Sequence, residues 1–305
     1  MGDAPPVSLG EGLTPLVPGP NGFSIKCEYV APSGSFKDRG SSVLVSGLKE
    51  AGVGEVFLDS SGNAGASMAM YCAAAGIKCE VLVPASTPGS KTRQAAAHGA
   101  TITRVDGSRE EVAMAARELA TTRIYASHNW QPLFIHGTKT LAYELLEQCG
   151  DDLPDHIVLP VGYGSLLMGL RLGFGELLSN GLINELPHLH AAQAAACAPL
   201  CASFQSGDTE VGPVNAGPTV AEAIATTNPI RGFAMLEALR ASGGSAVAIS
   251  ESEIPAAKDQ LARNGFYAEP SSAVAFAAAL NLQRDGVIGR EESVVVVLTG
   301  SGLKS

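Results

Sequence analysis

The chain has 305 residues, of which 46% are hydrophobic and 16% charged, which suits one compact two-lobed unit with a large core. Its net charge is −10, from 20 basic and 30 acidic residues, and with no basic run this argues against nucleic acid or anionic membrane as a partner. No apolar stretch is long enough to span a bilayer, and residues 1–5 lack the features of a signal peptide, so we expect a cytoplasmic protein.

The first half of the chain begins with a Gly- and Pro-rich segment and a strand-like run at 23–28, and then alternates short apolar strands with helices. The predicted strands are 56–59, 80–83, 101–105 and 123–126, and the predicted helices are 41–50, 64–75, 91–98 and 109–120. This alternation indicates a parallel sheet covered by helices on both faces.

A second such series fills the rest of the chain. The predicted strands are 157–160, 189–194, 246–249 and 294–298, and the predicted helices are 133–149, 165–178, 251–264 with Ser250 as N-cap, and 272–285. Residues 203–218 are expected to form a loop, and 220–226 to open a helix. Residues 294–298 (Val-Val-Val-Val-Leu) are the most apolar strand and should lie centrally in its sheet.

Six cysteines show neither a CxxC spacing nor a histidine at zinc-ligand distance, so we expect buried, reduced thiols and no metal site. They are Cys27, Cys72, Cys79, Cys149, Cys197 and Cys201.

Lys37 lies in a Ser- and Gly-rich turn (residues 31–40, Ala-Pro-Ser-Gly-Ser-Phe-Lys-Asp-Arg-Gly). A desolvated lysine amine can condense with a carbonyl cofactor, although a surface lysine beside a turn would look the same. Two other stretches, Ser60–Asn63 and Gly162–Ser165, each follow a predicted strand and precede a predicted helix. Backbone N–H groups at such a helix start suit an anion, although plain turns also use these residues.

Taken in order, these stretches and residues 298–304 (Leu-Thr-Gly-Ser-Gly-Leu-Lys) resemble the threonine synthase family, pyridoxal-phosphate enzymes with the tryptophan-synthase-β fold. The resemblance also includes Glu-Gly-Leu-Thr-Pro-Leu at 11–16, Gly-Thr-Lys-Thr at 137–140 and Glu-Pro-Ser-Ser-Ala at 269–273. It implies a two-lobed α/β fold, each lobe a mostly parallel twisted sheet with helices on both faces. Residues 41–132 would form a smaller lobe inserted into a larger one, 1–40 with 133–305. A ligand would bind between the lobes, and the protein would be a homodimer.

The resemblance also assigns roles. Lys37 would hold pyridoxal 5'-phosphate and act as the catalytic base, Asn63 would hydrogen-bond the phenolic oxygen of the ring, and Thr299 would meet the pyridine nitrogen. A hydroxyl cannot protonate that nitrogen as a carboxylic acid can, which favours elimination or replacement over transamination. The implied cofactor-binding residues are Phe36, Lys37, Asn63, Gly162, Tyr163, Gly164, Ser165, Leu166 and Thr299. The implied substrate-binding residues are Ser60, Ser61, Gly62, Ala64, Asn129 and Phe134, with His128 and His136 as further candidates.

Several positions depart from the family pattern around a substrate phosphate. Phosphohomoserine-using members resemble one another in an arginine two residues before the stretch that is 136–140 here, and this chain has Phe134 in its place. An arginine–phosphate pair is a strong contact, so its loss puts the substrate in doubt. The other departures are Ala64 for threonine, Tyr163 and Leu166 for two asparagines, and Ser301 for a frequent histidine.

The sequence thus predicts a pyridoxal-phosphate-dependent lyase acting on a small amino acid with a β- or γ-leaving group. The family reaction converts O-phosphohomoserine and water to threonine and phosphate. One alternative is a paralogue with another substrate, performing β-replacement of the cysteate-synthase type or β-elimination of the serine/threonine dehydratase type. Another is a catalytically idle homologue that binds an amino acid or a partner protein, against which Lys37, Asn63 and Thr299 argue.

Overall fold

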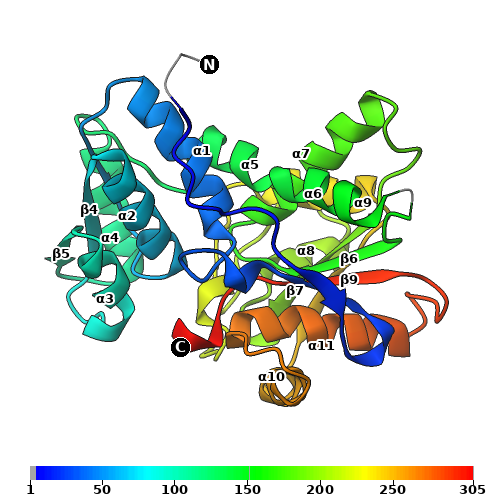
Figure 1. The fold of residues 1–305 in the computed structure, drawn as a ribbon. Helices are drawn as coiled ribbons and strands as arrows, with labels where there is room; N and C mark the ends of the chain where they lie inside the picture. Colours follow the sequence, from blue (N-terminus) through cyan, green and yellow to red (C-terminus); the bar gives the residue numbers. More distant parts are fainter. Residues whose placement is uncertain (1–4, 151, 305) are drawn as a thin grey trace. The chain divides into compact units, whose positions relative to one another are not determined.

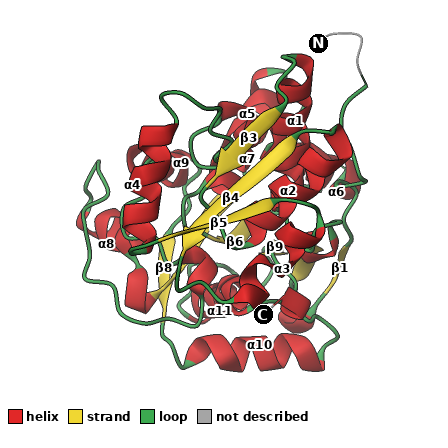
Figure 2. Cartoon of the chain, turned by 90° about the vertical axis from the view of Figure 1, so that its left-hand side faces the viewer, coloured by secondary structure: helices red, strands yellow, loops and turns green. Residues whose placement is uncertain are grey.

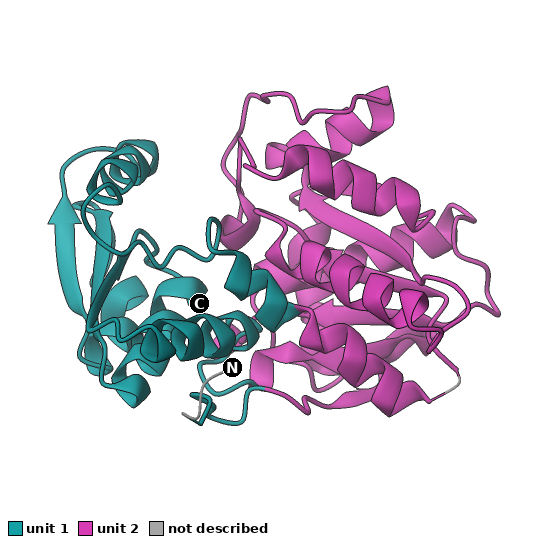
Figure 3. Cartoon of the chain, turned by 90° about the horizontal axis from the view of Figure 1, so that it is seen from above, with its two compact units in different colours: residues 1–11, 31–138 teal, residues 12–30, 139–305 magenta. Residues whose placement is uncertain are grey.

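The computed structural model describes residues 5–150 and 152–304, and the chain divides into two compact units (Figure 3). Unit 1 comprises residues 1–11 and 31–138, and unit 2 comprises 12–30 and 139–305. The expected lobes, 41–132 and 1–40 with 133–305, stay a prediction; by contacts, residues 31–40 and 133–138 group with 41–132 in unit 1. The reason is that α1 (Lys37–Glu50) is one continuous helix, which packs on α2 and α5 of the same unit.

Unit 1 is built on a three-stranded parallel sheet in the order β3-β4-β5 (Figure 2). Its strands are β3 (Glu55–Leu58), β4 (Lys78–Pro84) and β5 (Thr101–Val105), and its helices are α1, α2 (Asn63–Ala75), α3 (Gly89–Ala97), α4 (Arg109–Leu119) and α5 (Pro132–Thr138). Phe57 and Leu82 pack with Val112 of α4, whereas the alternate residues Val56 and Leu58 belong to the core under α1 and α2. Because side chains alternate along a strand, helices cover both faces of the sheet.

Unit 2 contains a six-stranded sheet in the order β1-β2-β9-β6-β7-β8, in which only the β1–β2 pair is antiparallel. Its strands are β1 (Leu16–Pro18), β2 (Ser24–Cys27), β6 (His156–Pro160), β7 (His188–Ala194), β8 (Ala246–Ile249) and β9 (Val294–Leu298). Its helices are α6 (Thr140–Cys149), α7 (Ser165–Ser179), α8 (Pro199–Ser206), α9 (Gly232–Ala241), α10 (Glu253–Arg263) and α11 (Pro270–Arg284). Figure 1 shows α10 and α11 on one face of this sheet and α6, α7 and α9 on the other. The fully buried β9 lies inside the sheet, as predicted.

Most predicted elements are confirmed, and three differ in type or extent. The single helix predicted at 133–149 is two helices, α5 and α6, which meet at Lys139 where unit 1 gives way to unit 2. The strand predicted at 123–126 is reduced to one bridge, Phe57 with Tyr125. The helix expected at 220–226 is a single 3-10 turn, Glu222–Ile224.

Three further corrections concern helix boundaries. Helix α8 extends into the loop predicted at 203–218, and α9 was not predicted at all. The N-cap of α10 is Ser252 rather than Ser250, and the hydroxyl of Ser250 instead donates to Glu253 Oε2 at 2.5 Å.

The cysteines are free thiols, as expected, and all but the partly exposed Cys149 are buried. The helices of the described residues all fall short of the length and hydrophobicity that crossing a bilayer requires.

Three histidines gather where β6 and β7 begin, at the opposite edge of the sheet from the loops that follow these strands. His156 Nδ1 lies 2.9 Å from His190 Nε2, and His156 Nε2 lies 2.9 Å from Glu292 Oε2. His190 Nδ1 lies 2.7 Å from the hydroxyl of Ser245. The ring of His188 stacks on His156 with centroids 5.0 Å apart. Each nitrogen of His190 therefore has a partner while the ring is neutral.

This cluster predicts acid sensitivity of the fold. Burial, followed by the neighbouring His156 and His188, lowers the pKa of His190 from 6.5 to about 3. Below pH ~6.5, His190 binds a proton in the unfolded chain but stays neutral in the folded protein. The free energy of unfolding should therefore fall as the pH is lowered from about 6.5 to about 3, by up to ~1.4 kcal/mol per pH unit. His190→Gln should flatten this slope in urea titrations between about pH 7 and 5. The partly exposed His98→Gln is the control, and equal slopes for His190→Gln and wild type would contradict the prediction.

Candidate active site

Lys37 is the first residue of α1, and the turn before it is held by the next residue, Asp38. The side chain of Asp38 is fully buried, and its Oδ2 accepts the backbone N–H of Ser33 at 2.6 Å. The carbonyl of Ser33 accepts the side-chain amide of Gln94, from α3, at 2.9 Å. The amine of Lys37 lies 3.9 Å from the centroid of the Phe36 ring. Hydrogen bonds to both the backbone N–H and the carbonyl of Ser33 therefore fix the turn that precedes Lys37.

The same carboxylate ties Lys37 to the second predicted stretch. Asp38 Oδ1 accepts the hydroxyl of Ser67, on α2, at 2.6 Å, and Ser67 also lies 2.7 Å from the hydroxyl of Ser41. Ser67 is one helical turn after Asn63, so the two residues share a face of α2. Within unit 1, the structure therefore brings together the first turns of α1 and α2, which carry Lys37 and Asn63.

The loop before α2 leaves its helix start without a side-chain cap. The N-cap residue is Gly62, and no side chain bonds to the first turn from that position. A Cβ on Gly65 would lie 1.8 Å from the carbonyl oxygen of Ser60, so close contact between loop and helix requires glycine there. Ser60 and Ala64 are buried, whereas Ser61, Gly62 and Asn63 are at least partly exposed. An uncapped helix start of this kind suits a carboxylate.

Asn129 lies in a segment that runs beside the end of β3. The N–H of Ala126 donates to the carbonyl of Phe57 at 2.8 Å, and the hydroxyl of Tyr125 donates to Asp59 at 2.5 Å. This pairing carries Asn129 toward the edge of the sheet where the Ser60 loop begins. The side chain of Asn129 is 8% exposed, and its Oδ1 is buried with no hydrogen-bond partner among the described residues. A buried amide oxygen in this position lacks the donor that it needs, which fits a ligand-binding role.

Phe134 lies in the core of unit 1 and exposes no surface. A Cβ on Gly40 would lie 2.4 Å from its ring, and the ring of His128 meets it edge-on at 5.7 Å. The position where the family resemblance implies an arginine is thus used here for packing α5 against α1. Its expected role toward substrate stays a prediction, and the other candidate, His136, is exposed.

In unit 2, the loop Gly162–Gly164 joins β6 to α7. Gly164 is the N-cap of α7, has a φ of +80°, and provides no side-chain cap. A Cβ on it would lie 2.0 Å from the sulfur of Met235, so only glycine fits. Ser165 and Leu166 are buried in the first turn of α7, and Tyr163 is partly exposed. The result is a backbone-lined helix start that suits a phosphate group.

Thr299 follows β9, the neighbour of β6, so its loop and the Gly162 loop leave the same edge of the sheet. Its hydroxyl lies 3.1 Å from that of Ser272, which also accepts the N–H groups of Thr299 and Gly300 at 3.0 and 2.9 Å. A Cβ on Gly300 would lie 2.3 Å from the carboxyl carbon of Glu269. Ser272 and Glu269 therefore fix the Thr299 loop. Both residues belong to the stretch 269–273 of the family resemblance, which assigns neither of them a role.

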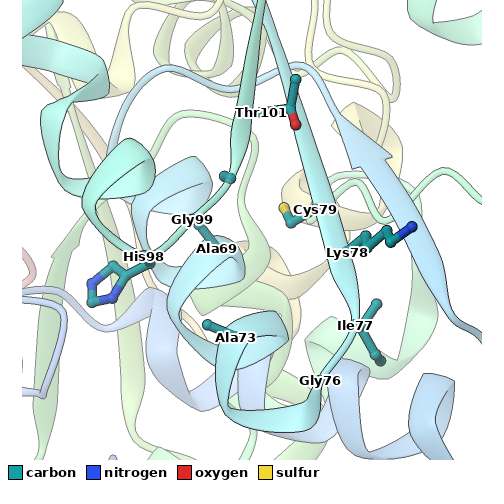
Figure 4. A pocket seen from close by; sticks show the side chains of 10 residues that line it. Ala69, Ala73, Gly76, Ile77, Lys78, Cys79, His98, Gly99 and Thr101 are labelled. Carbon is teal, nitrogen blue, oxygen red and sulfur yellow. The ribbon is translucent and has the colours of Figure 1, made fainter.

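A surface pocket of about 280 Å³ in unit 1 lies away from these residues (Figure 4). It is lined by the end of α2, the start of β4 and the turn before β5, including Cys79, His98 and Gly99. This is the edge of the sheet where β4 and β5 begin, whereas the Ser60 loop follows the end of β3. The pocket carries none of the predicted site residues.

The residues present fit pyridoxal phosphate. Each unit is considered by itself. In unit 1, the amine of Lys37 suits a carbonyl and the amide of Asn63 suits a ring oxygen. In unit 2, the uncapped start of α7 suits a phosphate and the hydroxyl of Thr299 suits a ring nitrogen. The orphaned Oδ1 of Asn129 and the glycines that a Cβ would displace are consistent with ligands that approach the backbone closely.

Comparisons with known proteins agree with this chemistry. The family model described as "Pyridoxal-phosphate dependent enzyme" matches residues 7–300. The chain is 36% identical to a threonine synthase of Methanocaldococcus jannaschii, over 98% of this chain and 76% of that protein. It is 36% identical to a threonine synthase of Mycobacterium tuberculosis, over 99% of this chain and 84% of that protein.

Solved structures are similar over most of their length. A threonine deaminase from T.th. has a TM-score of 0.79 at 26% identity, covering 94% of this chain and 92% of that chain. A serine racemase from Dictyostelium discoideum has a TM-score of 0.77 at 26% identity, covering 95% of this chain and 92% of that chain. These likenesses confirm the predicted fold class.

Proposed function

Because this chain belongs to the threonine synthase family of pyridoxal-phosphate-dependent enzymes, we propose that it is a lyase acting on a small amino acid with a β- or γ-leaving group. The observation that carries the proposal is the buried carboxylate of Asp38, which joins the first turn of α1 to α2 through Ser67. This tie holds Lys37 and Asn63 on two helices in fixed register, as a reaction that uses both residues requires.

Different residues of the chain have different roles in this proposal. Lys37 would hold the cofactor through its amine and, once the substrate amine has taken its place, would remove and return the proton at the substrate Cα. The start of α2 would bind the substrate carboxylate through backbone N–H groups, and the amide of Asn63 would hydrogen-bond the ring. The start of α7 would hold the phosphate. Bound pyridoxal phosphate supplies the electron sink that makes the Cα proton acidic.

Thr299 decides which reactions follow. Its hydroxyl, which lies 3.1 Å from that of Ser272, would give the pyridine nitrogen a neutral partner and leave that nitrogen largely unprotonated. The weaker electron sink suits loss of a β- or γ-substituent better than transamination. Glu269 lies beside Gly300, and its backbone N–H donates to the carbonyl of Gly300 at 2.9 Å. We assign the main chain of Glu269 to holding the loop.

The leaving group is where this chain departs from its relatives. With Phe134 packed in the core and Ala64 buried, neither position offers a cation or hydroxyl to a substrate phosphate. A hydroxyl or another small leaving group fits this site better than a phosphate. β-Elimination from a hydroxyamino acid is therefore the second candidate reaction, and likeness to the threonine deaminase and serine racemase structures favours it.

We expect weak phosphate release from O-phosphohomoserine by the wild-type protein. The missing arginine contact corresponds to about 1.5–3 kcal/mol, or an affinity roughly ten- to hundredfold lower than an arginine-containing site would give. The measurement is steady-state phosphate release, run beside keto-acid formation from serine and threonine. Phe134→Leu, which keeps an apolar core residue, is the control and should not change the ranking of substrates. Efficient threonine formation from O-phosphohomoserine would show the interpretation of Phe134 to be wrong.

A further inference from the structure

The loop that follows β9 is hydrogen-bonded to the first turn of α11. Ser272, in that turn, is fully buried, and its hydroxyl oxygen accepts the backbone N–H of Thr299 at 3.0 Å and that of Gly300 at 2.9 Å. The carbonyl of Gly300 in turn accepts the backbone N–H of Glu269 at 2.9 Å. The main chain that carries the Thr299 side chain is therefore fixed by contacts within unit 2.

The hydroxyl oxygen of Ser272 has no free lone pair left for Thr299. A serine hydroxyl has one proton to donate and two lone pairs with which to accept. Both lone pairs of Ser272 are engaged by backbone N–H groups, and the hydroxyl oxygen of Thr299 lies 3.1 Å away. In a hydrogen bond between the two hydroxyls, Ser272 is therefore the donor and Thr299 the acceptor.

The carbonyl of Gly300 is a second acceptor within reach of the Ser272 proton. It lies 3.3 Å from the Ser272 oxygen and already accepts the N–H of Glu269, whereas the hydroxyl oxygen of Thr299 is closer. With either acceptor, the proton of the Thr299 hydroxyl does not point at Ser272. Among residues 5–150 and 152–304, that hydroxyl makes no other hydrogen bond, so its proton has no acceptor there.

We propose that Ser272 is a positioning residue that directs the hydroxyl proton of Thr299 toward a hydrogen-bond acceptor of the ligand. The inference rests on the function proposed above, in which Thr299 meets the pyridine nitrogen of the cofactor. A hydroxyl that accepts one hydrogen bond and keeps its own proton unengaged is a donor, and a donor suits a nitrogen that has a lone pair rather than a proton. Ser272 would thus favour the unprotonated ring, and with it loss of a β- or γ-substituent over transamination.

Glu269 is the competing group at this loop. Its carboxyl carbon would lie 2.3 Å from a Cβ on Gly300, so a carboxylate comes close to the main chain next to Thr299. A carboxylate at the pyridine nitrogen would favour the protonated ring, whereas a hydroxyl that donates its proton favours the unprotonated ring. The protonation state of the bound ring nitrogen therefore distinguishes the two groups.

The test observes the ring nitrogen by nuclear magnetic resonance, in the full-length protein loaded with pyridoxal phosphate that is isotope-labelled at that nitrogen. The signal separates a free pyridine nitrogen from one that accepts a hydrogen bond and from a protonated one. The variants are Ser272→Ala, Thr299→Val and the double variant, with Ser271→Ala as the matched control. Ser271 is also buried, but its hydroxyl accepts the N–H of Ala223, at 3.2 Å, rather than a group of the Thr299 loop.

Wild type should give the signal of an unprotonated nitrogen that accepts a hydrogen bond. In Ser272→Ala, the signal should move toward that of a free pyridine nitrogen, and the affinity for pyridoxal phosphate should fall roughly two- to tenfold, the range for one hydrogen bond. In the Thr299→Val background, Ser272→Ala should cause no further change of the signal, because Ser272 acts through the Thr299 hydroxyl. Ser271→Ala should match wild type.

Three results would overturn the proposal: a protonated ring nitrogen in wild type, an unchanged signal in Ser272→Ala, or a shift by Ser272→Ala that persists in the Thr299→Val background. A lower melting temperature of Ser272→Ala with an unchanged nitrogen signal would mean that Ser272 only supports the loop. Ser272→Cys keeps the shape of the side chain with a weaker donor, so it serves as the test if Ser272→Ala does not fold. Its signal should lie between those of wild type and a free pyridine nitrogen, and a wild-type signal would contradict the proposal.

The same measurement separates this inference from the role proposed for Thr299. An unchanged signal in Thr299→Val would show that Thr299 does not meet the ring, and both assignments would fail. A changed signal in Thr299→Val together with an unchanged signal in Ser272→Ala would refute the role of Ser272 alone. The nitrogen signal needs no turnover, so the result holds even if the lyase reaction is not found.

Discussion

Replacing Lys37 by alanine is expected to abolish turnover, by more than about 10³-fold, and to remove the covalent attachment of the cofactor. One amine both holds the cofactor and moves the Cα proton, so no neighbouring group can replace it in both roles. The fold should survive, because Lys37 is partly exposed at the start of α1 and the buried anchor of the turn is Asp38. Borohydride reduction of the wild type followed by peptide mass spectrometry should locate the cofactor on Lys37.

The matched control for this experiment is Lys49→Ala, an exposed lysine in the last turn of the same helix. It should retain full activity and the visible absorbance of the bound cofactor. Cofactor recovered on Lys49, Lys91 or Lys139, or substantial turnover by Lys37→Ala, would refute the assignment of Lys37.

The sequence predicts well those helices and strands that have a recognisable pattern of residues within their own length or at their ends. Buried parallel strands such as 294–298 are continuous apolar runs, and glycines mark where the helices end, as Gly76 does after α2. The break between α5 and α6 has no such mark. It lies just after a close contact between helices, since a Cβ on Gly137 would lie 2.1 Å from the carbonyl of Arg39 on α1. A contact between residues almost a hundred positions apart leaves no periodicity to detect.

The candidate site residues also divide into those marked by a local sequence pattern and those that depend on long-range contacts. Lys37, Asn63 and Thr299 are predicted from short motifs and from the family resemblance, and their roles stay predictions. Asn63 and Thr299 lie just beyond strand ends, where parallel topology collects ligand-binding loops. Asp38, Ser67 and Ser272 were not given roles, because a buried carboxylate or hydroxyl acquires a role only from the partner that folding brings to it.

Lys26→Met is expected to cost about 3–5 kcal/mol of unfolding free energy, the range for breaking a buried ion pair from one side. Lys26 is fully buried, and its three ammonium protons have three acceptors in the Thr14 carbonyl, Glu144 and Gln148, at 2.7, 2.5 and 2.7 Å. Glu144 also accepts the N–H groups of Leu13 and Thr14 at 2.9 and 2.8 Å. Without the lysine, this carboxylate would remain buried without its cation.

The control is Lys139→Met, since Lys139 pairs with the exposed Glu176 and such surface pairs contribute only about 0–1 kcal/mol. Urea unfolding at neutral pH should therefore separate the two variants by several kcal/mol. Adding Glu144→Gln to Lys26→Met removes the stranded charge but keeps an oxygen for the N–H groups of Leu13 and Thr14, so it should recover part of the loss. A double variant no more stable than Lys26→Met would mean that lost packing around the lysine stem, rather than the unpaired carboxylate, causes the instability.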